Sequence, residues 1–312
     1  MNRGTVVRVL VTVAFLGWFV HQFGLANIVE ALGRAPGACV QATLLSLVLI
    51  LTLALRWQLL LSALDLAPRF SAVIRATFVG SVASICLPSV GGDVVRVMYL
   101  AREPGTTAAV AVSAAVDRWF GLVALVVLGL TATIGHRPSA RLGDVVQGVY
   151  VAVSVVLVLT VAVALVFRAA RPSALARPSG PIRRLDRLVG LGRSVGAAMD
   201  LYAGRKLALA QALGMAMVSQ LLSIFIYYWL ARAVGATSGV FDFLYGVPVV
   251  TLVAVVPISL GGIGVSEWAF VQVFADLGMA PDVTLAVSLL NLVARTAGGL
   301  IGGAIAWLTG RW

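Results

Sequence analysis

The sequence predicts an all-α integral membrane protein with about six spanning helices and two broken re-entrant hairpins in an inverted-topology repeat. Of its 312 residues, 61% are hydrophobic and 11% are charged, whereas soluble domains carry about 25% charged residues. The uncharged runs 38–55, 145–167 and 207–231 approach or exceed the roughly 20 apolar residues that a bilayer core requires. A break containing proline, serine and paired glycines occurs twice, about 170 residues apart.

The apolar runs place six full crossings. The first apolar stretch, 9–20, follows Arg3 and Arg8 and has the size of a signal-peptide core. No small-x-small cleavage site follows it, so we interpret it as part of a spanning helix. The second helix carries Arg56 and Trp57 near its end, and we interpret this pair as an interfacial anchor. The predicted crossings are 5–24, 38–60, 106–134, 145–168, 206–233 and 282–309.

The formal net charge is +11, with one lysine among 23 basic residues. Such a charge on a soluble protein would suggest nucleic-acid binding. Here the arginines fall mostly between apolar segments, so the positive-inside rule explains them better. The polar stretch 169–205 is then a basic cytoplasmic loop. It separates a first membrane repeat, 1–168, from a second, 206–312, within one membrane domain, and both termini are expected in the cytoplasm.

The two breaks decide the topology. They read PSVGG at 88–92 and PISLGG at 257–262. In a helix interior proline costs about 3 kcal/mol and each glycine about 1 kcal/mol, and bare backbone cannot face lipid. We therefore predict re-entrant hairpins over 70–102 and 240–278, which enter from opposite sides, as in inverted-repeat transporters. The alternative is that both stretches are kinked crossings, which gives eight in all.

Charged side chains inside apolar segments are the candidate functional residues, since each costs roughly 2.5–3.5 kcal/mol to insert. One interpretation is that they only pair with each other and hold the bundle together. The other is that helix N-termini at Gly92 and Gly264, with Arg118 and Arg295, bind a phosphate group. An acid in such a cavity could also take up a proton. The charged set is Asp93, Arg96, Asp117, Arg118, Glu267 and Arg295.

Other chemistries are not indicated. Gly262 and Gly264 lack the preceding strand and the third glycine or lysine of a nucleotide-binding loop. His21 and His136 stand alone, and Cys39 and Cys86 have no metal or redox spacing. The sequence offers no nucleophile–base signature. We therefore expect no enzymatic activity and no cofactor, and we interpret both cysteines as small core residues.

Three motifs carry a family resemblance: PSVGGDVVR at 88–96, VDRWFGL at 116–122 and PISLGGIGVSE at 257–267, followed by Arg295. Together they resemble the lysylphosphatidylglycerol synthase transmembrane family, also called the flippase-like domain family, over essentially the whole chain. The resemblance implies a lipid-translocating domain. The resemblance assigns twelve residues to substrate binding and transport: Pro88, Gly91, Gly92, Asp93, Arg96, Asp117, Arg118, Gly261, Gly262, Gly264, Glu267 and Arg295. We add Pro257 of the second break to this set.

Aminoacyl-transferring members of that family carry a large soluble catalytic domain after further helices, and this sequence ends at Trp312. We therefore expect a stand-alone flippase that moves a lipid with a polar or anionic headgroup across a bacterial inner membrane. The alternative is a non-transporting accessory subunit of a lipid- or glycolipid-synthesis pathway. A membrane transferase is a third hypothesis. The expected partners are membrane lipids, with lipid-synthesis enzymes and a second copy of the chain as further candidates and no nucleic acid.

Overall fold

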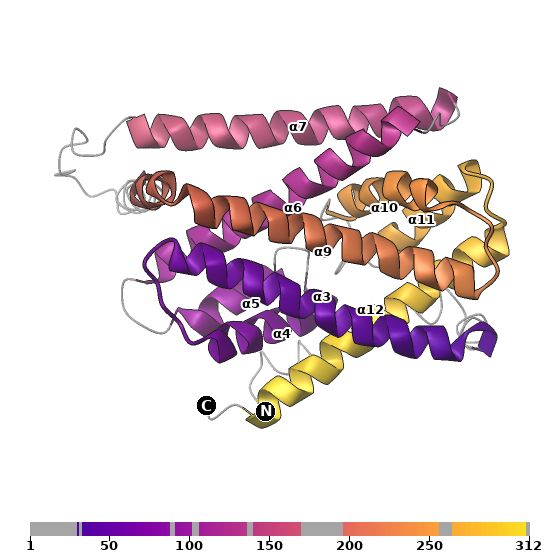
Figure 1. The fold of residues 1–312 in the computed structure, drawn as a ribbon, viewed down its shortest axis with the longest axis horizontal. Helices are drawn as coiled ribbons and strands as arrows, with labels where there is room; N and C mark the ends of the chain where they lie inside the picture. The colour runs from indigo at the N-terminus through magenta and orange to yellow at the C-terminus, as the bar shows by residue number, and fades with distance from the viewer. Residues whose placement is uncertain are drawn as a thin grey trace, which may run out of the picture.

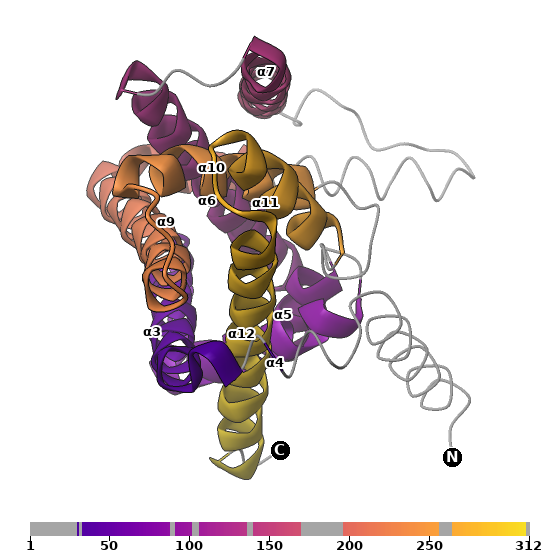
Figure 2. The same cartoon turned by 90° about the vertical axis from the view of Figure 1, so that its right-hand side faces the viewer.

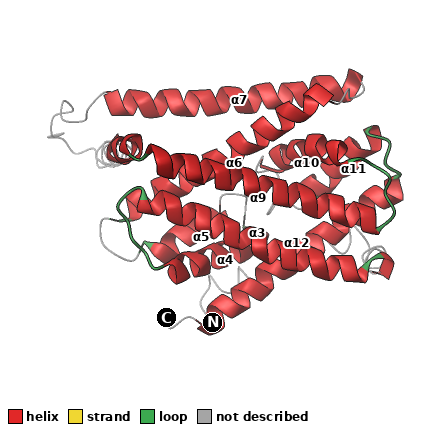
Figure 3. Cartoon of the chain, in the orientation of Figure 1, coloured by secondary structure: helices red, strands yellow, loops and turns green. Residues whose placement is uncertain are grey.

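The computed structural model describes residues 30, 33–87, 91–101, 106–135, 140–169, 196–255 and 264–309. Every regular element within these ranges is a helix (Figures 1 and 3). Residues 30, 33–34 and 196–204 are helical and adjoin segments that lie outside the described residues. The remaining helices are α3 (Pro36–Ser62), α4 (Phe70–Cys86), α5 (Gly91–Leu100), α6 (Thr107–Gly135), α7 (Ala140–Ala169), α9 (Lys206–Ala233), α10 (Val240–Val255), α11 (Val265–Asp276) and α12 (Pro281–Thr309).

Five of these helices, α3, α6, α7, α9 and α12, are long and apolar enough to cross a membrane. Their bounds lie within a few residues of five predicted crossings. Proline starts α3 at Pro36 and α12 at Pro281, a position where its missing N–H removes no helical hydrogen bond. The sixth predicted crossing, 5–24, and most of the basic loop lie outside the described residues.

In each range predicted to form a hairpin, two short helices pack against each other, α4 with α5 and α10 with α11. In the first, a Cβ on Gly80 would lie 2.9 Å from the carbonyl oxygen of Gly92 and 3.0 Å from the Cβ of Arg96. In the second, a Cβ on Gly246 would lie 2.8 Å from the ring of Phe274. The limbs therefore fold back on each other instead of continuing in one direction, which disfavours two kinked crossings.

The two halves share one order of elements: a long helix, a hairpin of two short helices, and a second long helix. The turn after the first long helix is the same in both. The N–H of Asp65 donates to the carbonyl of Ser62, and about 170 residues later the N–H of Gly235 donates to that of Arg232. Both turn residues have positive φ, 57° at Asp65 and 87° at Gly235, which asparagine, aspartate and glycine tolerate best.

The equivalent helices α3 and α9 lie side by side and run in opposite directions (Figure 1). Residues early in α3 contact residues late in α9, and the order reverses along the pair. The contacts are Trp229 Nε1 to Gln41 Oε1 at 3.0 Å, Ser219 Oγ to Thr52 Oγ1 at 3.0 Å and Arg205 Nη2 to Asp65 Oδ1 at 2.7 Å. The antiparallel direction of this pair is one feature that the predicted inverted-topology repeat requires.

The remaining packing repeats this symmetry. Helix α12 of the second half packs on α3 and α4, and α6 of the first half packs on α9 and α10 (Figure 2). Glycines on α12 allow it to pack closely on α3 and α4. Gly298 faces Ser46 of α3, Gly302 faces Phe78 of α4, and Gly303 faces Val82 of α4. Small residues one helical turn apart are typical of closely packed helices in membrane proteins. Helix α7 lies at the edge of the bundle, packed against α6 and α10, and exposes most of its valines.

Candidate functional site

Five charged residues of the first half form one network, called here the first-half network: Arg56, Asp93, Arg96, Asp117 and Arg118. Asp117 is its centre, with 2% of its surface exposed. It accepts from Arg56 Nε at 2.5 Å and from Arg96 Nη2 at 2.9 Å. Asp93 pairs with the same Arg96 nitrogen at 3.0 Å and with Arg118 Nη1 at 2.5 Å. The four charged residues predicted from the first half therefore do come together, with Arg56 added.

Helix geometry explains how these side chains meet. Asp93 and Arg96 are three residues apart on α5 and so share one face. Asp117 and Arg118 are adjacent on α6, so their side chains diverge: Asp117 reaches Arg96 and Arg56, and Arg118 reaches Asp93. The closely packed hairpin brings α5 against α4, where Gly92 has no room for a side chain beside Ser84 and the carbonyl of Gly80.

Trp57 completes the network on its α3 side. Its ring is fully buried, and the Arg96 guanidinium carbon lies 4.6 Å from the ring centroid. Its indole Nε1 donates to Ser113 Oγ at 3.0 Å. The prediction that Arg56 and Trp57 form an interfacial anchor is wrong, since both are buried against α6. The sequence pattern of an arginine–tryptophan pair near a helix end is the same whether the pair faces lipid headgroups or a buried aspartate, so the sequence could not distinguish the two.

In the second half, Glu267 and Arg295 lie together, but more loosely. The Arg295 Nη2 to Glu267 Oε1 distance is 3.8 Å, and the two side chains are 40% and 4% exposed. Glu267 also accepts from the Gly264 N–H at 2.6 Å and from Ser266 Oγ at 2.9 Å. The expectation of an anion-binding helix end at Gly264 therefore needs correction, because the Glu267 carboxylate already bonds to the N–H of this residue.

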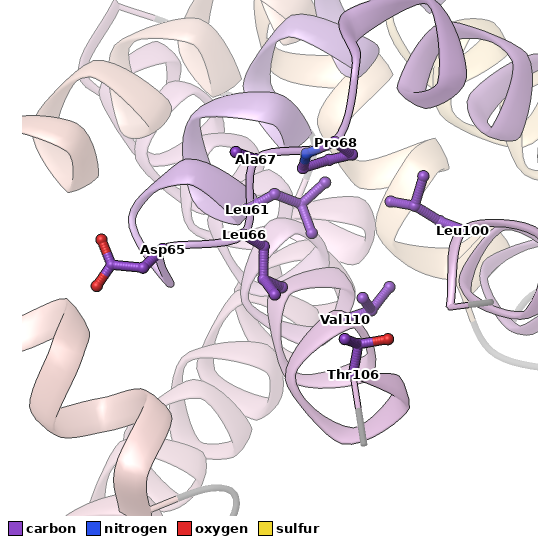
Figure 4. A pocket seen from close by; sticks show the side chains of 8 residues that line it. All are labelled: Leu61, Asp65, Leu66, Ala67, Pro68, Leu100, Thr106 and Val110. Atoms are coloured by element: carbon purple, nitrogen blue, oxygen red, sulfur yellow. The ribbon is translucent and has the colours of Figure 1, made fainter. Parts of the chain in front are cut away.

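A cavity of about 350 Å³ lies where the α3–α4 turn, the end of α5 and the start of α6 meet (Figure 4). Its wall combines apolar side chains from Leu61, Leu66, Leu100 and Val110 with the polar side chains of Asp65 and Thr106. The predicted site residues Pro88, Pro257, Gly261 and Gly262 lie outside the described residues. Within the described part of the chain, no cluster of three His, Cys, Asp or Glu could hold a metal ion.

The structure thus places two arginine–carboxylate clusters where short helices, α5 and α11, meet long apolar helices that include α6 and α12. A model of the lysylphosphatidylglycerol synthase transmembrane region matches residues 5–303. The chain belongs to this family. It is a membrane domain of the lysylphosphatidylglycerol synthase transmembrane type, as the sequence motifs indicate. A search of the curated proteins gave no significant match, and a search of the solved structures gave none either.

Proposed function

We propose that this membrane protein is a lipid transporter of the flippase type, which moves a lipid with an anionic headgroup between the two leaflets. The observation that carries the proposal is Arg295. It lies in the middle of α12, an apolar helix long enough to span a membrane, yet its side chain is 40% exposed. Its carboxylate partner, Glu267, is shared with the Gly264 N–H and the Ser266 hydroxyl.

A guanidinium in this setting favours an anionic ligand. A charged side chain at membrane depth is costly unless it pairs or faces water, and the described clusters contain four arginines against three carboxylates. Arginine binds phosphate through two parallel hydrogen bonds. A lipid phosphate supplies that partner, while its acyl chains stay in the bilayer. The substrate class proposed is therefore a phosphate-bearing lipid.

We place the protein in a bacterial inner membrane, with both termini in the cytoplasm. The basis is the arginine-rich stretch 169–205, which carries far more positive charge than the other connections. Positive loops remain on the cytoplasmic side. The partners proposed are the lipids themselves.

The test is lipid translocation by the purified protein in proteoliposomes, with fluorescent phosphatidylglycerol and phosphatidylcholine compared. We expect faster movement of the anionic lipid by the parent protein and loss of that movement in Glu267→Gln. Glu30→Gln is the matched control, since Glu30 is exposed and pairs only with Arg34 among the described residues. A folded parent protein that moves neither lipid would overturn the proposal and favour an accessory subunit.

A further inference from the structure

The cavity at the α3–α4 turn lies one helical turn from the first-half network. Three cavity-lining residues each share a helix face with Trp57 or with one of its two polar partners, because helix positions three or four apart lie above one another. The three pairs are Trp57 and Leu61 on α3, Arg96 and Leu100 on α5, and Ser113 and Val110 on α6. Trp57, Arg96 and Ser113 therefore form a layer between the cavity (Figure 4) and Asp117.

Besides its packing in a buried apolar cluster, two polar contacts fix the Trp57 ring in this layer. One is the hydrogen bond from its Nε1 to Ser113 Oγ at 3.0 Å. The other is the Arg96 guanidinium, whose carbon lies 4.6 Å from the ring centroid. The same guanidinium pairs with Asp93 and Asp117. The position of the ring is thus tied to the state of the ion pairs.

We propose that Trp57 is a gate between this cavity and the first-half network, and that an anionic headgroup opens it by drawing Arg96 off the ring. The proposal rests on the proposed lipid transport. A phosphate competes for the guanidinium through charge-assisted, bidentate hydrogen bonds. Once Arg96 turns toward a phosphate, the indole loses its charged partner and keeps its bond to Ser113 and its packing in the apolar cluster. Headgroup binding and opening toward the cavity are then coupled.

The second half shows that an aromatic stack at this place needs no arginine. Tyr227 on α9 corresponds to Trp57 on α3, and Phe270 on α11 corresponds to Arg96 on α5. There the two rings stack, with centroids 5.0 Å apart and an interplanar angle of 17°. An arginine in a buried layer carries a desolvation cost that a phenylalanine avoids. The charged partner of Trp57 therefore does more than fill the core: it makes the layer responsive to an anion.

Cysteine accessibility tests the gate. Ala54 is fully buried and belongs to the same apolar cluster as Trp57, one turn further from the cavity. In a Cys39→Ser, Cys86→Ser background, an Ala54→Cys thiol would be labelled with a membrane-impermeant methanethiosulfonate in phosphatidylcholine vesicles, with and without phosphatidylglycerol. We expect slow labelling in phosphatidylcholine alone and labelling at least fivefold faster with phosphatidylglycerol.

Two variants separate a gate from simple packing. Trp57→Ala should raise the labelling rate at least tenfold without added phosphatidylglycerol. Ser113→Ala keeps the indole but removes the hydrogen bond that holds it, so the labelling rate should rise severalfold. This variant keeps the test valid if Trp57→Ala does not fold. The matched control is Trp229→Ala, since Trp229 is an exposed tryptophan bonded to Gln41.

The gate is overturned if Ser113→Ala labels at the parent rate, if phosphatidylglycerol has no effect, or if Trp229→Ala labels as fast as Trp57→Ala. Lipid translocation is measured separately in the same vesicles. Absence of translocation by the parent overturns the proposed function. Translocation with unchanged Ala54→Cys labelling overturns only the gate.

Discussion

Asp93 and Glu267 occupy the same place in the two halves of the molecule. Each is the third residue of the second hairpin limb, α5 or α11, and each pairs with an arginine of the long helix that follows. Their surroundings differ. Asp93 lies between two arginines, whereas Glu267 bonds to the Gly264 N–H and the Ser266 hydroxyl and has one arginine at 3.8 Å. The first half is thus tightly paired and the second loosely paired.

Removing the central charge of the first-half network should destabilise the fold. Asp117→Asn leaves the Arg56 and Arg96 guanidiniums, both under 10% exposed, without their shared carboxylate. Loss of one partner from a buried ion pair costs about 3–5 kcal/mol. We expect a loss of that size in the free energy of unfolding, measured by denaturant titration in mixed micelles.

The control for this prediction is Asp282→Asn. Asp282 makes the same kind of ion pair, with Arg34 at 3.3 Å, but both side chains are exposed. Exposed pairs contribute about 0–1 kcal/mol. Equal losses of stability in the two variants would show that Asp117 does not act as a buried counter-ion.

The sequence predicts the elements of this fold well because its apolar runs and breaks are long and clear. The limits of α9, for instance, agree with the predicted crossing 206–233. It also indicates that Asp93, Arg96, Asp117 and Arg118 are functional or paired, because charge in an apolar helix is costly. It does not reveal that Arg56 joins them. That depends on the rotation of α3 against α6, which the packing of several helices sets together, and a single sequence carries no local signal for it.

Arg295→Gln should abolish lipid movement with little effect on stability. The pair with Glu267 is long, and without it the carboxylate keeps its bonds to the Gly264 N–H and the Ser266 hydroxyl. Its loss should therefore cost less than the roughly 3–5 kcal/mol of a tightly paired buried ion pair. If the guanidinium binds the lipid phosphate, the translocation rate should fall at least tenfold. The translocation rate and the free energy of unfolding are measured on one preparation. Arg34→Gln is the control, since Arg34 forms an exposed ion pair. A large loss of stability in Arg295→Gln would instead assign Arg295 a structural role.

Gly302→Ala should separate α12 from α4. A Cβ at Gly302 overlaps the ring of Phe78, so the ring or the helix must shift. Overpacking of this kind typically costs about 1–3 kcal/mol. Gly214→Ala in α9 is the matched change, since nothing lies within 4 Å of its new Cβ, and there alanine should add up to about 1 kcal/mol through helix propensity. Thermal unfolding should show a lower melting temperature for Gly302→Ala and a higher one for Gly214→Ala. Shifts in the same direction would contradict the close packing of α12 on α4.

Gly264→Ala and Gly278→Ala separate backbone strain from transport. Both glycines have nearly the same positive φ, 85° and 84°, at the two ends of α11. An L-residue in such a conformation costs roughly 1–2 kcal/mol, so both variants should lose similar stability. Only Gly264 donates its N–H to Glu267, at 2.6 Å. Relaxation of the strained backbone at Gly264 should move that N–H and the carboxylate it orients, and translocation should fall severalfold. At Gly278 no charged residue is held in this way, so translocation should persist. The contrary result is that both variants transport lipid at the parent rate while losing the expected stability. That result would show that the hydrogen bond from the Gly264 N–H to Glu267 stabilises α11 and does not position the carboxylate for transport.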